Sequence, residues 1–241
     1  MNPWSQLKRF TSARVALGRA GSSLPTAALL EFELARARAR DAVHASFDVE
    51  AIERGVESLG WRIVRVRSAA RDRAEYLRRP DLGRRLYAKL EDLPTVPPDL
   101  IFVIADGLSA RAAEAHAVPL LSVLEPKLNG WGIGPVFLAE QARVALADEL
   151  GEVCRAKMAV MLIGERPGLS APDSLGAYLT YEPRIGRSDA ERNCLSNIRP
   201  EGLTYEIAAH RLLHLLEGAR RLRLTGIRLK DESDAVPAIL S

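Results

Sequence analysis

Hydrogen-bonding and titratable side chains are concentrated in one stretch, residues 162–210, where Ser, Asp, Arg, Asn, Cys and Pro occupy positions that a buried core would not favour. The stretch follows an apolar run at 160–163 and opens with Gly164, Glu165 and Arg166. Loops that leave the end of a buried strand commonly carry binding residues. We therefore expect ligand contacts at this strand end, where a charged acceptor such as Glu165 would bind amide or hydroxyl groups strongly.

Two other apolar runs end in a similar way. One ends at Asp106 and Gly107, and another is followed by residues 140–144. In open parallel sheets, ligands bind beyond the carboxyl ends of the strands. The sequence thus offers three candidate strand ends for a binding site.

The standard catalytic signatures do not occur in the sequence. The chain has no GxxxxGK[ST] phosphate loop, no GxSxG elbow, no HExxH and no paired CxxC, so neither a hydrolase triad nor a zinc site is indicated. The glycines at 130, 132 and 134 lack the spacing of a dinucleotide fingerprint and precede an expected strand. His210 and His214 have the i, i+4 spacing of a metal pair on a helix, but no third ligand lies near them in the sequence. We therefore expect no metal site in this chain.

Composition is that of an ordinary globular protein. The 241 residues are 47% apolar and 27% charged, which allows a sizeable core. The 34 basic and 31 acidic residues leave a formal charge of +3, too small for a general nucleic-acid argument, so the local Arg clusters are better explained as solvated helix faces or partner contacts. The chain has two cysteines, no signal-like start and no apolar run of about 18–20 residues, which favours a soluble, intracellular protein without nucleic acid or membrane as partner.

Strand-like and helix-like segments alternate after residue 46. Strands are expected at 61–67, 100–105, 135–139, 157–163 and 178–181, and helices at 48–59, at 69–93 with a break near Pro80, and at 109–117, 145–154 and 204–224. The run at 100–105 is wholly apolar, as expected of a central parallel strand. The run at 61–67 alternates apolar and basic residues, as expected of a strand near a sheet edge.

This alternation predicts an α/β fold, with a Rossmann-like, doubly wound and mostly parallel sheet that carries helices on both faces. Residues 1–46 show no strand pattern, are rich in Arg and Ala, and have leucines at helical spacing within 27–44. We therefore predict a helical N-terminal arm at 1–46, followed by an α/β domain at 47–241 that carries the candidate site.

Five segments together resemble the small (light) subunit of ethanolamine ammonia-lyase. They lie at 13–44, 104–117, 139–152, 162–187 and 189–203, in the order of that family, so that the match extends over most of the chain. The specific part of the match is the combination of IGERPGL, which starts at Ile163, with ERNCLSNIRPEGL, which starts at Glu191.

The resemblance implies a carbon–nitrogen lyase that uses adenosylcobalamin to convert ethanolamine to acetaldehyde and ammonia by a radical route. In that family the large subunit holds the substrate and most catalytic groups, and the small subunit closes over the cobalamin at the subunit interface. By motif, the family's cofactor contacts fall on Val144, Glu165 and Cys194, and no catalytic residue falls on this chain. No D-x-H-x-x-G segment surrounds a histidine here, so the cofactor is expected to keep its own benzimidazole on cobalt.

The three residue types suit such a role, although each also has a structural explanation. Val144 would offer apolar surface and backbone polar groups at a helix start, Glu165 a charged acceptor, and Cys194 a small polarisable side chain in a loop. From the residues alone, Val144 could be core, Cys194 could be buried and Glu165 could pair with Arg166. Two other functions stay open on these grounds: an unrelated nucleotide-binding module, and a structural interaction subunit without direct cofactor contacts.

The resemblance also concerns assembly. It implies a hetero-oligomer of several large/small pairs that acts on ethanolamine in the cytoplasm, and it is compatible with packaging in a bacterial microcompartment. The sequence itself carries no signal for the number of pairs or for the packaging.

Overall fold

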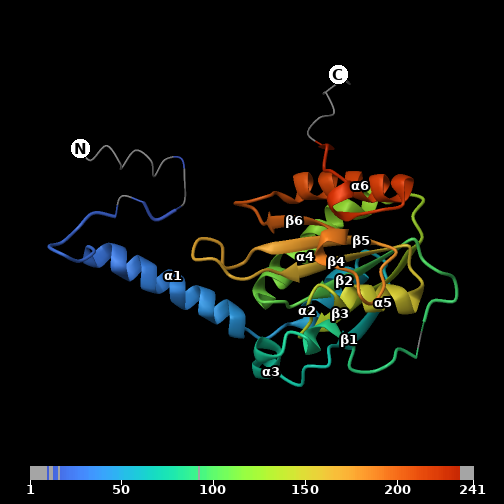
Figure 1. The fold of residues 1–241 in the computed structure, drawn as a ribbon, viewed down its shortest axis with the longest axis horizontal. Coiled ribbons are helices and arrows are strands. Elements are labelled where there is room, and N and C mark those ends of the chain that lie inside the picture. The colour runs from blue at the N-terminus through green and yellow to red at the C-terminus, as the bar shows by residue number, and fades with distance from the viewer. Residues whose placement is uncertain (1–9, 11–12, 16, 92, 234–241) are drawn as a thin grey trace.

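The computed structural model of the chain describes residues 10, 13–15, 17–91 and 93–233. The helices in this part are α1 (Thr26–His44), α2 (Val49–Glu57), α3 (Arg73–Arg78), α4 (Ala110–Leu124), α5 (Leu146–Cys154) and α6 (Tyr205–Leu222). The strands are β1 (Ile63–Arg67), β2 (Leu100–Ala105), β3 (Ile133–Glu140), β4 (Met158–Gly164), β5 (Leu175–Tyr181) and β6 (Arg192–Ile198) (Figure 1). Short 3₁₀ turns lie at Leu82–Arg84, Glu125–Lys127, Asp189–Glu191 and Gly226–Arg228.

The six strands form one sheet in the order β1-β3-β2-β4-β5-β6. The strands β1, β3, β2 and β4 are parallel, whereas β5 is antiparallel to both β4 and β6. The predicted α/β class with a mostly parallel sheet is therefore confirmed. The last two strands add an antiparallel edge, which is common in large α/β sheets.

Two strands behave as their patterns predict. All six residues of β2 are buried, and the strand lies between β3 and β4 in the parallel half of the sheet. By contrast, β1 forms one edge, and its Arg65 and Arg67 are exposed. Hydrophobic runs thus mark strands that are covered on both faces, and alternation marks strands with a solvated face.

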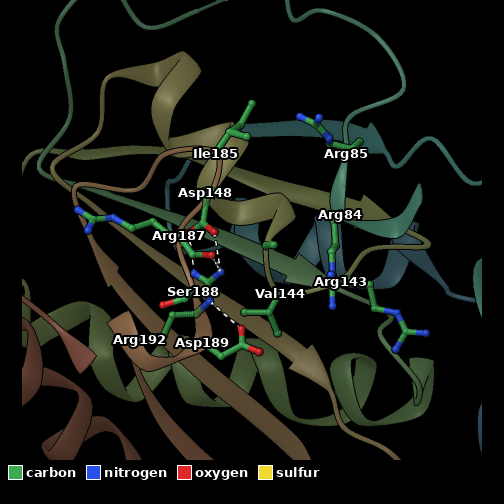
Figure 2. Close-up of a pocket in the computed structure, with 12 residues that line it drawn as sticks. Arg84, Arg85, Arg143, Val144, Asp148, Ile185, Arg187, Ser188, Asp189 and Arg192 are labelled. Atoms are coloured by element: carbon green, nitrogen blue, oxygen red, sulfur yellow. Dashed lines mark hydrogen bonds and ion pairs between the residues drawn. The ribbon is translucent and has the colours of Figure 1, made fainter. Parts of the chain in front are cut away.

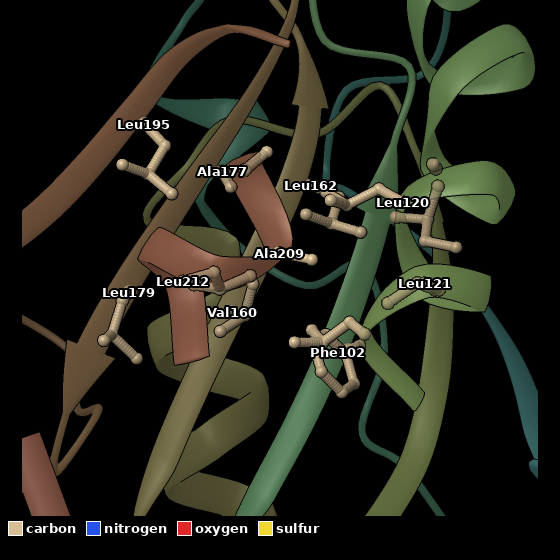
Figure 3. Packing of buried hydrophobic residues seen from close by; sticks show 14 of the residues in the cluster. Phe102, Leu120, Leu121, Val160, Leu162, Ala177, Leu179, Leu195, Ala209 and Leu212 are labelled. Carbon is tan, nitrogen blue, oxygen red and sulfur yellow. The ribbon is translucent and has the colours of Figure 1, made fainter. Parts of the chain in front are cut away.

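Helices pack on both faces of the sheet, but they cover them unequally. On the first face, α2, α4 and α6 bury side chains from the strands β2 to β6, among them Phe102, Val160 and Leu179 (Figure 3). On the second face, α5 packs over β2, β3 and β4. Among the described hydrophobic residues of β5 and β6, Tyr178 alone reaches this second core, and it is half-buried at the margin. Thr180 and Arg192 on the same face are buried next to Asp148 of α5. We call the uncovered part of the second face, formed by Tyr178, Cys194 and Ser196, the open sheet face.

The sequence pattern did not predict β6. Its residues are mostly polar, which led to their assignment to a polar connection. An edge strand needs apolar side chains on one face only, and here Leu195 and Ile198 supply them to the first core, while Cys194 and Ser196 are exposed. The prediction that Cys194 lies in a loop is therefore wrong, since it lies within a strand.

Residues 69–93 are also less helical than predicted. The α-helix here is α3, whose N-cap Asp72 accepts a hydrogen bond from the Glu75 N–H at 2.8 Å. After the 3₁₀ turn at Leu82–Arg84, the chain pairs with the end of β1, since the Tyr87 N–H donates to the Arg67 carbonyl at 3.1 Å. Leu86 and Leu90 then pack against the second core. The apolar residues that suggested a helix serve instead to cover one side of the sheet.

The helix α1 leaves the α/β body as an arm (Figure 1). Its bounds agree with the helix predicted at 27–44. Its buried residues are Ala35 and Ala42, while Leu30 and Leu34 are 64% and 52% exposed. Residues 1–9, 11, 12 and 16 lie outside the described residues, and the division into an arm at 1–46 and a domain at 47–241 stays a prediction.

Candidate functional site

The three strand ends picked out from the sequence lie side by side at one edge of the sheet. Ala105 at the end of β2 is in register with Ala139 of β3 and with Ile163 of β4. The residues that follow, Asp106, the segment 140–144 and Glu165, therefore leave the sheet next to one another. This is the position at which α/β sheets bind ligands.

The ends of β2 and β4 are in direct backbone contact. The N–H of Leu108 donates to the Gly164 carbonyl oxygen at 2.9 Å. A Cβ at Gly107, which has a φ of +54°, would lie 2.2 Å from that oxygen, and a Cβ at Gly164 would lie 1.9 Å from the Ser109 carbonyl oxygen. Both positions therefore need glycine, and we call this contact the glycine seam.

Asp106 organises the segment that follows β3. It is 2% exposed, and its Oδ1 accepts hydrogen bonds from the N–H groups of Gly107 at 2.9 Å and Ala142 at 3.2 Å. Its Oδ2 pairs with the Arg73 guanidinium at 3.0 Å. Burial raises the pKa of Asp106 to about 6, against the opposing effect of Arg73. The carboxylate thus holds the segment 141–144 in place, with Gln141 at a left-handed φ of +55°.

Tyr76 holds the same segment from the other side. Its ring is fully buried, and its hydroxyl donates to the Ala142 carbonyl oxygen at 3.0 Å. The guanidinium carbons of Arg73 and Arg143 lie 4.8 Å and 4.3 Å from the ring centroid, so the ring contacts two cations. A buried anion, a buried aromatic ring and two arginines therefore fix the residues just before Val144.

Val144 is half-buried and precedes Ala145, the N-cap residue of α5. Its side chain packs at the margin of the second core, so the structural explanation for an apolar residue is met in part. It also lines two neighbouring cavities. The predicted position of Val144 at a helix start is confirmed.

Glu165 follows β4 and is held by two segments. Its Oε2 accepts a hydrogen bond from the Ser174 hydroxyl and another from the Asn197 N–H at 3.2 Å. No ion pair between Glu165 and Arg166 is found in the part of the chain that the structure describes. Gly176 lies under the carboxylate, where a Cβ would be 2.9 Å from Oε1. Glu165 is therefore oriented by neighbours that leave it at the surface of a cavity.

Cys194 lies on the open sheet face, directly opposite Tyr178 in the β5–β6 pair. It is exposed, and its Sγ lies 3.4 Å from the Ser196 hydroxyl oxygen. It lines neither of the two cavities, but its neighbour Tyr178 lines one of them together with Val144 and Glu165. The structure therefore brings the three sequence-predicted positions to one region, with Tyr178 in the middle.

The two cavities adjoin each other at the start of α5. The smaller cavity, of about 380 Å³, lies between Val144, Glu165 and Tyr178 and reaches the glycine seam. The larger cavity, of about 620 Å³, is lined by several arginines, and we call it the arginine-lined cavity (Figure 2). Arg143 and Val144 line both. A ligand large enough to occupy both would span roughly 1,000 Å³, the upper end of the usual range for small-molecule sites.

Comparison with known proteins agrees with the sequence resemblance. A family model described as Ethanolamine ammonia-lyase light chain (EutC) matches residues 1–230. The ethanolamine ammonia-lyase small subunit of Azotobacter vinelandii is 56% identical over 242 residues, which cover 97% of this chain and 90% of that protein. The small subunits of Pseudomonas syringae pv. tomato and Pseudomonas aeruginosa are each 54% identical, over 96% and 97% of this chain and 84% and 89% of their own lengths.

The chain belongs to the ethanolamine ammonia-lyase light chain family. This confirms the family suggested by IGERPGL and ERNCLSNIRPEGL. The first of these motifs forms the end of β4 with its Glu165 loop, and the second runs along β6 and the turn after it. The family signature of the light chain therefore lies on the open sheet face and at the edge of the smaller cavity.

Other features of the light chain complete the description. Among its described residues, no helix is long and apolar enough to cross a membrane. No cluster of three His, Cys, Asp or Glu side chains in that same part is arranged to hold a metal ion.

Sequence reasoning missed Arg73, Tyr76 and Tyr178. The light chain brings the first two from α3, which lies far from the strand ends in sequence, so only the folded chain reveals the contact. A signal did exist in α3, where Tyr76 and Leu77 are the large apolar residues of a charged helix. Tyr178 was placed correctly in a strand, but its importance depends on β6, which was not expected.

Proposed function

We propose that this light chain, together with a large subunit, forms an adenosylcobalamin-dependent ethanolamine ammonia-lyase that converts ethanolamine to acetaldehyde and ammonia by a radical mechanism. The chain supplies no catalytic residue. It closes over the cobalamin at the interface of the two subunits through Val144, Glu165 and Cys194. Several such pairs in one cytoplasmic assembly, with or without a microcompartment shell, belong to the same proposal.

One observation carries this proposal. In a chain of the ethanolamine ammonia-lyase light chain family, the three positions expected to contact the cofactor gather around the smaller cavity and the open sheet face. They come from three separate segments of the sequence, so their proximity depends on the fold. A single ligand that contacts all three residues requires this convergence.

The residues present suit a cobalamin. The corrin ring is broad and largely apolar with a rim of amides, so it needs a wide surface with a few fixed polar groups. The open sheet face is such a surface, with the Tyr178 ring and the Cys194 thiol on paired strands. Glu165 adds a fixed acceptor, because Oε2 is held by Ser174 and Asn197, while Oε1 accepts no hydrogen bond from any described residue.

The chain's own contribution is to bind and to orient. When bound, adenosylcobalamin supplies the radical chemistry of the reaction. Glu165 would accept a hydrogen bond from a ligand amide or hydroxyl, and Val144 and Tyr178 would exclude water from the apolar ring edge. Asp106 and Tyr76 keep these contacts at fixed positions, which reduces the ordering cost of binding.

The test is acetaldehyde release from ethanolamine by this chain, a large subunit of the same enzyme and adenosylcobalamin, with each component omitted in turn. We expect release only from the complete mixture. Release without this chain would make it an accessory. No release, with both proteins folded and associated, would contradict the proposed function.

A structural interaction subunit is the second candidate, and α1 favours it. Exposed Leu30 and Leu34 on an arm outside the body are suited to protein contacts. Under this alternative, a variant with Val144, Glu165 and Cys194 all changed would keep both activity and cofactor affinity. Loss of cofactor affinity in that variant, with the two subunits still associated, would exclude it.

A further inference from the structure

The arginine-lined cavity is unusually rich in positive charge. Five arginines line it: Arg84, Arg85, Arg143, Arg187 and Arg192. The acidic residues in its wall are Asp148 and Asp189. Figure 2 shows Arg84, Arg85 and Arg143 on one side of the cavity and Arg187 and Arg192 on the other, with Val144 between them.

The acidic residues are already paired with the arginines on their own side. Asp148 and Arg192 form a bidentate pair, with nitrogen–oxygen distances of 3.1 Å and 2.9 Å, and both side chains are 2% exposed. Asp189 lies 3.4 Å from the same guanidinium. Arg187 pairs with Glu191 and also donates to the Glu182 carbonyl oxygen at 3.0 Å. The charge on this side of the cavity is therefore largely compensated.

The opposite side is not compensated. Within the described residues, Arg84, Arg85 and Arg143 form no ion pair with a carboxylate. The Nε of Arg143 is buried and has no hydrogen-bond partner in that part of the chain. The N–H of Arg143 donates to the Gly83 carbonyl oxygen at 2.8 Å, so Arg84 and Arg143 come from segments in direct contact. Three cations are thus gathered at one wall with no carboxylate of the described residues paired to them.

The start of α5 adds two backbone donors to the same wall. The N–H groups of Leu146, Ala147 and Asp148 donate to the carbonyls of residues 143–145, whereas those of Val144 and Ala145 donate to no described residue. Both of these residues line the cavity. Unpaired N–H groups at the positive end of a nine-residue helix favour an anion. Guanidinium groups, free N–H groups and a concave shape together match a phosphate ester.

We propose that the arginine-lined cavity is a phosphate subsite, in which Arg84, Arg143 and the N–H groups of Val144 and Ala145 bind the phosphodiester of the cobalamin nucleotide tail. The inference rests on the proposed function and adds to it a second anchoring point. Arg143 and Val144 line both cavities, so a corrin at the smaller cavity would direct its tail into the larger one. Arg85 contributes to the positive potential of the wall.

The test uses the assembled enzyme and two probes, hydroxocobalamin and cobinamide, which is the same corrin without the nucleotide tail. Equilibrium dialysis gives the dissociation constant of each probe for wild type, Arg84→Gln, Arg143→Gln and the control Arg54→Gln. Arg54 is exposed on α2, on the other face of the sheet, so the control removes the same charge elsewhere. We expect each subsite variant to weaken hydroxocobalamin binding about ten- to a hundredfold, the usual cost of one charged hydrogen bond.

Cobinamide affinity should stay unchanged in Arg84→Gln, and the control should bind both probes as wild type does. Arg143 also lines the smaller cavity and contacts the Tyr76 ring, so Arg143→Gln should weaken cobinamide binding, but less than hydroxocobalamin binding. Arg84→Lys should restore part of the hydroxocobalamin affinity, because it keeps the charge and loses the forked geometry. Equal weakening of both probes would overturn the proposal, since the arginines would then act on the corrin or on the fold. Unchanged hydroxocobalamin binding in Arg84→Gln and Arg143→Gln would overturn it as well.

Two further measurements distinguish the phosphodiester of the cofactor from a free phosphate ester and from carboxylates of the large subunit. Inorganic phosphate should compete with hydroxocobalamin and leave cobinamide binding unchanged; phosphate that binds without competing would assign the cavity to a free phosphate ester instead. Reduced subunit association of Arg84→Gln without cofactor would assign the arginines to carboxylates of the large subunit. The proposed function fails separately, if Glu165→Ala and Val144→Asp leave cobinamide affinity unchanged.

Discussion

The second face of the sheet is covered to different extents in two regions. Over β2, β3 and β4, the helix α5 buries residues such as Phe137 and Met161 completely. Over β5 and β6, the same face exposes Cys194 and Ser196 and leaves Tyr178 half-buried. Both regions are backed by the same core on the first face, where α6 packs on β5 and β6. Around Tyr178, Cys194 and Ser196 the two strands are therefore held by one covered face, which leaves this part of the other face available for binding.

The strongest way to test this comparison is a matched pair of aromatic substitutions on the second face. We expect Phe137→Ala in the closed region to lower the free energy of unfolding by about 3–5 kcal/mol, because it opens a cavity in a packed core. Tyr178→Ala on the open sheet face should cost about 1–2 kcal/mol, because the side chain is only partly buried. Urea denaturation of the isolated light chain gives both values. Equal losses would mean that the two regions are equally packed.

A second test addresses the rigid frame beneath the site. Asp106→Ala leaves the Arg73 guanidinium buried without its anion and removes the acceptor of the Ala142 N–H. The expected loss is about 3–5 kcal/mol in the free energy of unfolding, the usual cost of breaking a buried ion pair on one side. The conservative Asp106→Asn keeps an acceptor and should lose less. If both variants unfold at the urea concentration of wild type, the pair does not stabilise the strand ends.

A third test separates binding from folding on the open side. Glu165→Ala should weaken cofactor affinity of the assembled enzyme by about tenfold or more, as expected for a lost charged acceptor. Its effect on the free energy of unfolding should be about 1 kcal/mol, because the exposed Asn197 N–H can bind water while the buried Ser174 hydroxyl loses one hydrogen bond. Dialysis with hydroxocobalamin and urea denaturation measure the two effects. A larger loss of stability than of affinity would make Glu165 a structural residue.

The smallest expected change in the free energy of unfolding is that of a cysteine substitution, and the two cysteines are distinguished by their reactivity. Burial of Cys154, the last residue of α5, raises the pKa of its thiol to about 11. Partial desolvation raises the pKa of the Cys194 thiol as well, but Cys194 is exposed on β6. A thiol reagent should therefore modify Cys194 in the folded light chain and reach Cys154 only after unfolding. Cys194→Ser should change the free energy of unfolding by less than about 0.5 kcal/mol and abolish the fast reaction.

The same assay also tests the interface. Addition of the large subunit and hydroxocobalamin should slow the modification of Cys194, because the proposed cofactor contact would cover it. Modification at the same rate in the complete assembly would place Cys194 outside the cofactor interface.

The parallel half of the fold could be predicted because its strands carry complete patterns. The residues 100–105 are apolar throughout and match β2 at both ends, and 61–67 alternates as an edge strand does. The antiparallel half could not be predicted, since β6 has apolar side chains on one face only and its register depends on β5. For the same reason Cys194 was assigned to a loop.

The candidate site divides in a similar way. Val144 and Glu165 could be placed at strand ends, because carboxyl ends of parallel strands share an edge. The residues that hold them, Arg73 and Tyr76, lie in a charged segment without a strong pattern. They contact Asp106 and the Ala142 carbonyl, which lie far from them in the sequence, so no local sequence pattern predicts these contacts. The sequence alone therefore predicted the contact residues Val144 and Glu165, but not Arg73 and Tyr76, which hold the segment before Val144 in place.

The glycine seam between β2 and β4 has a consequence for how the site could be redesigned. Backbone atoms of Gly107 and Gly164 touch there, so no side-chain substitution can change the separation of the two strand ends without distorting the sheet. Altered specificity would instead have to come from the flanking loops, 141–144 and 165–174. The spacing between the ends of β2 and β4 is therefore constant, and substitutions in the two loops are the way to accommodate cofactor analogues.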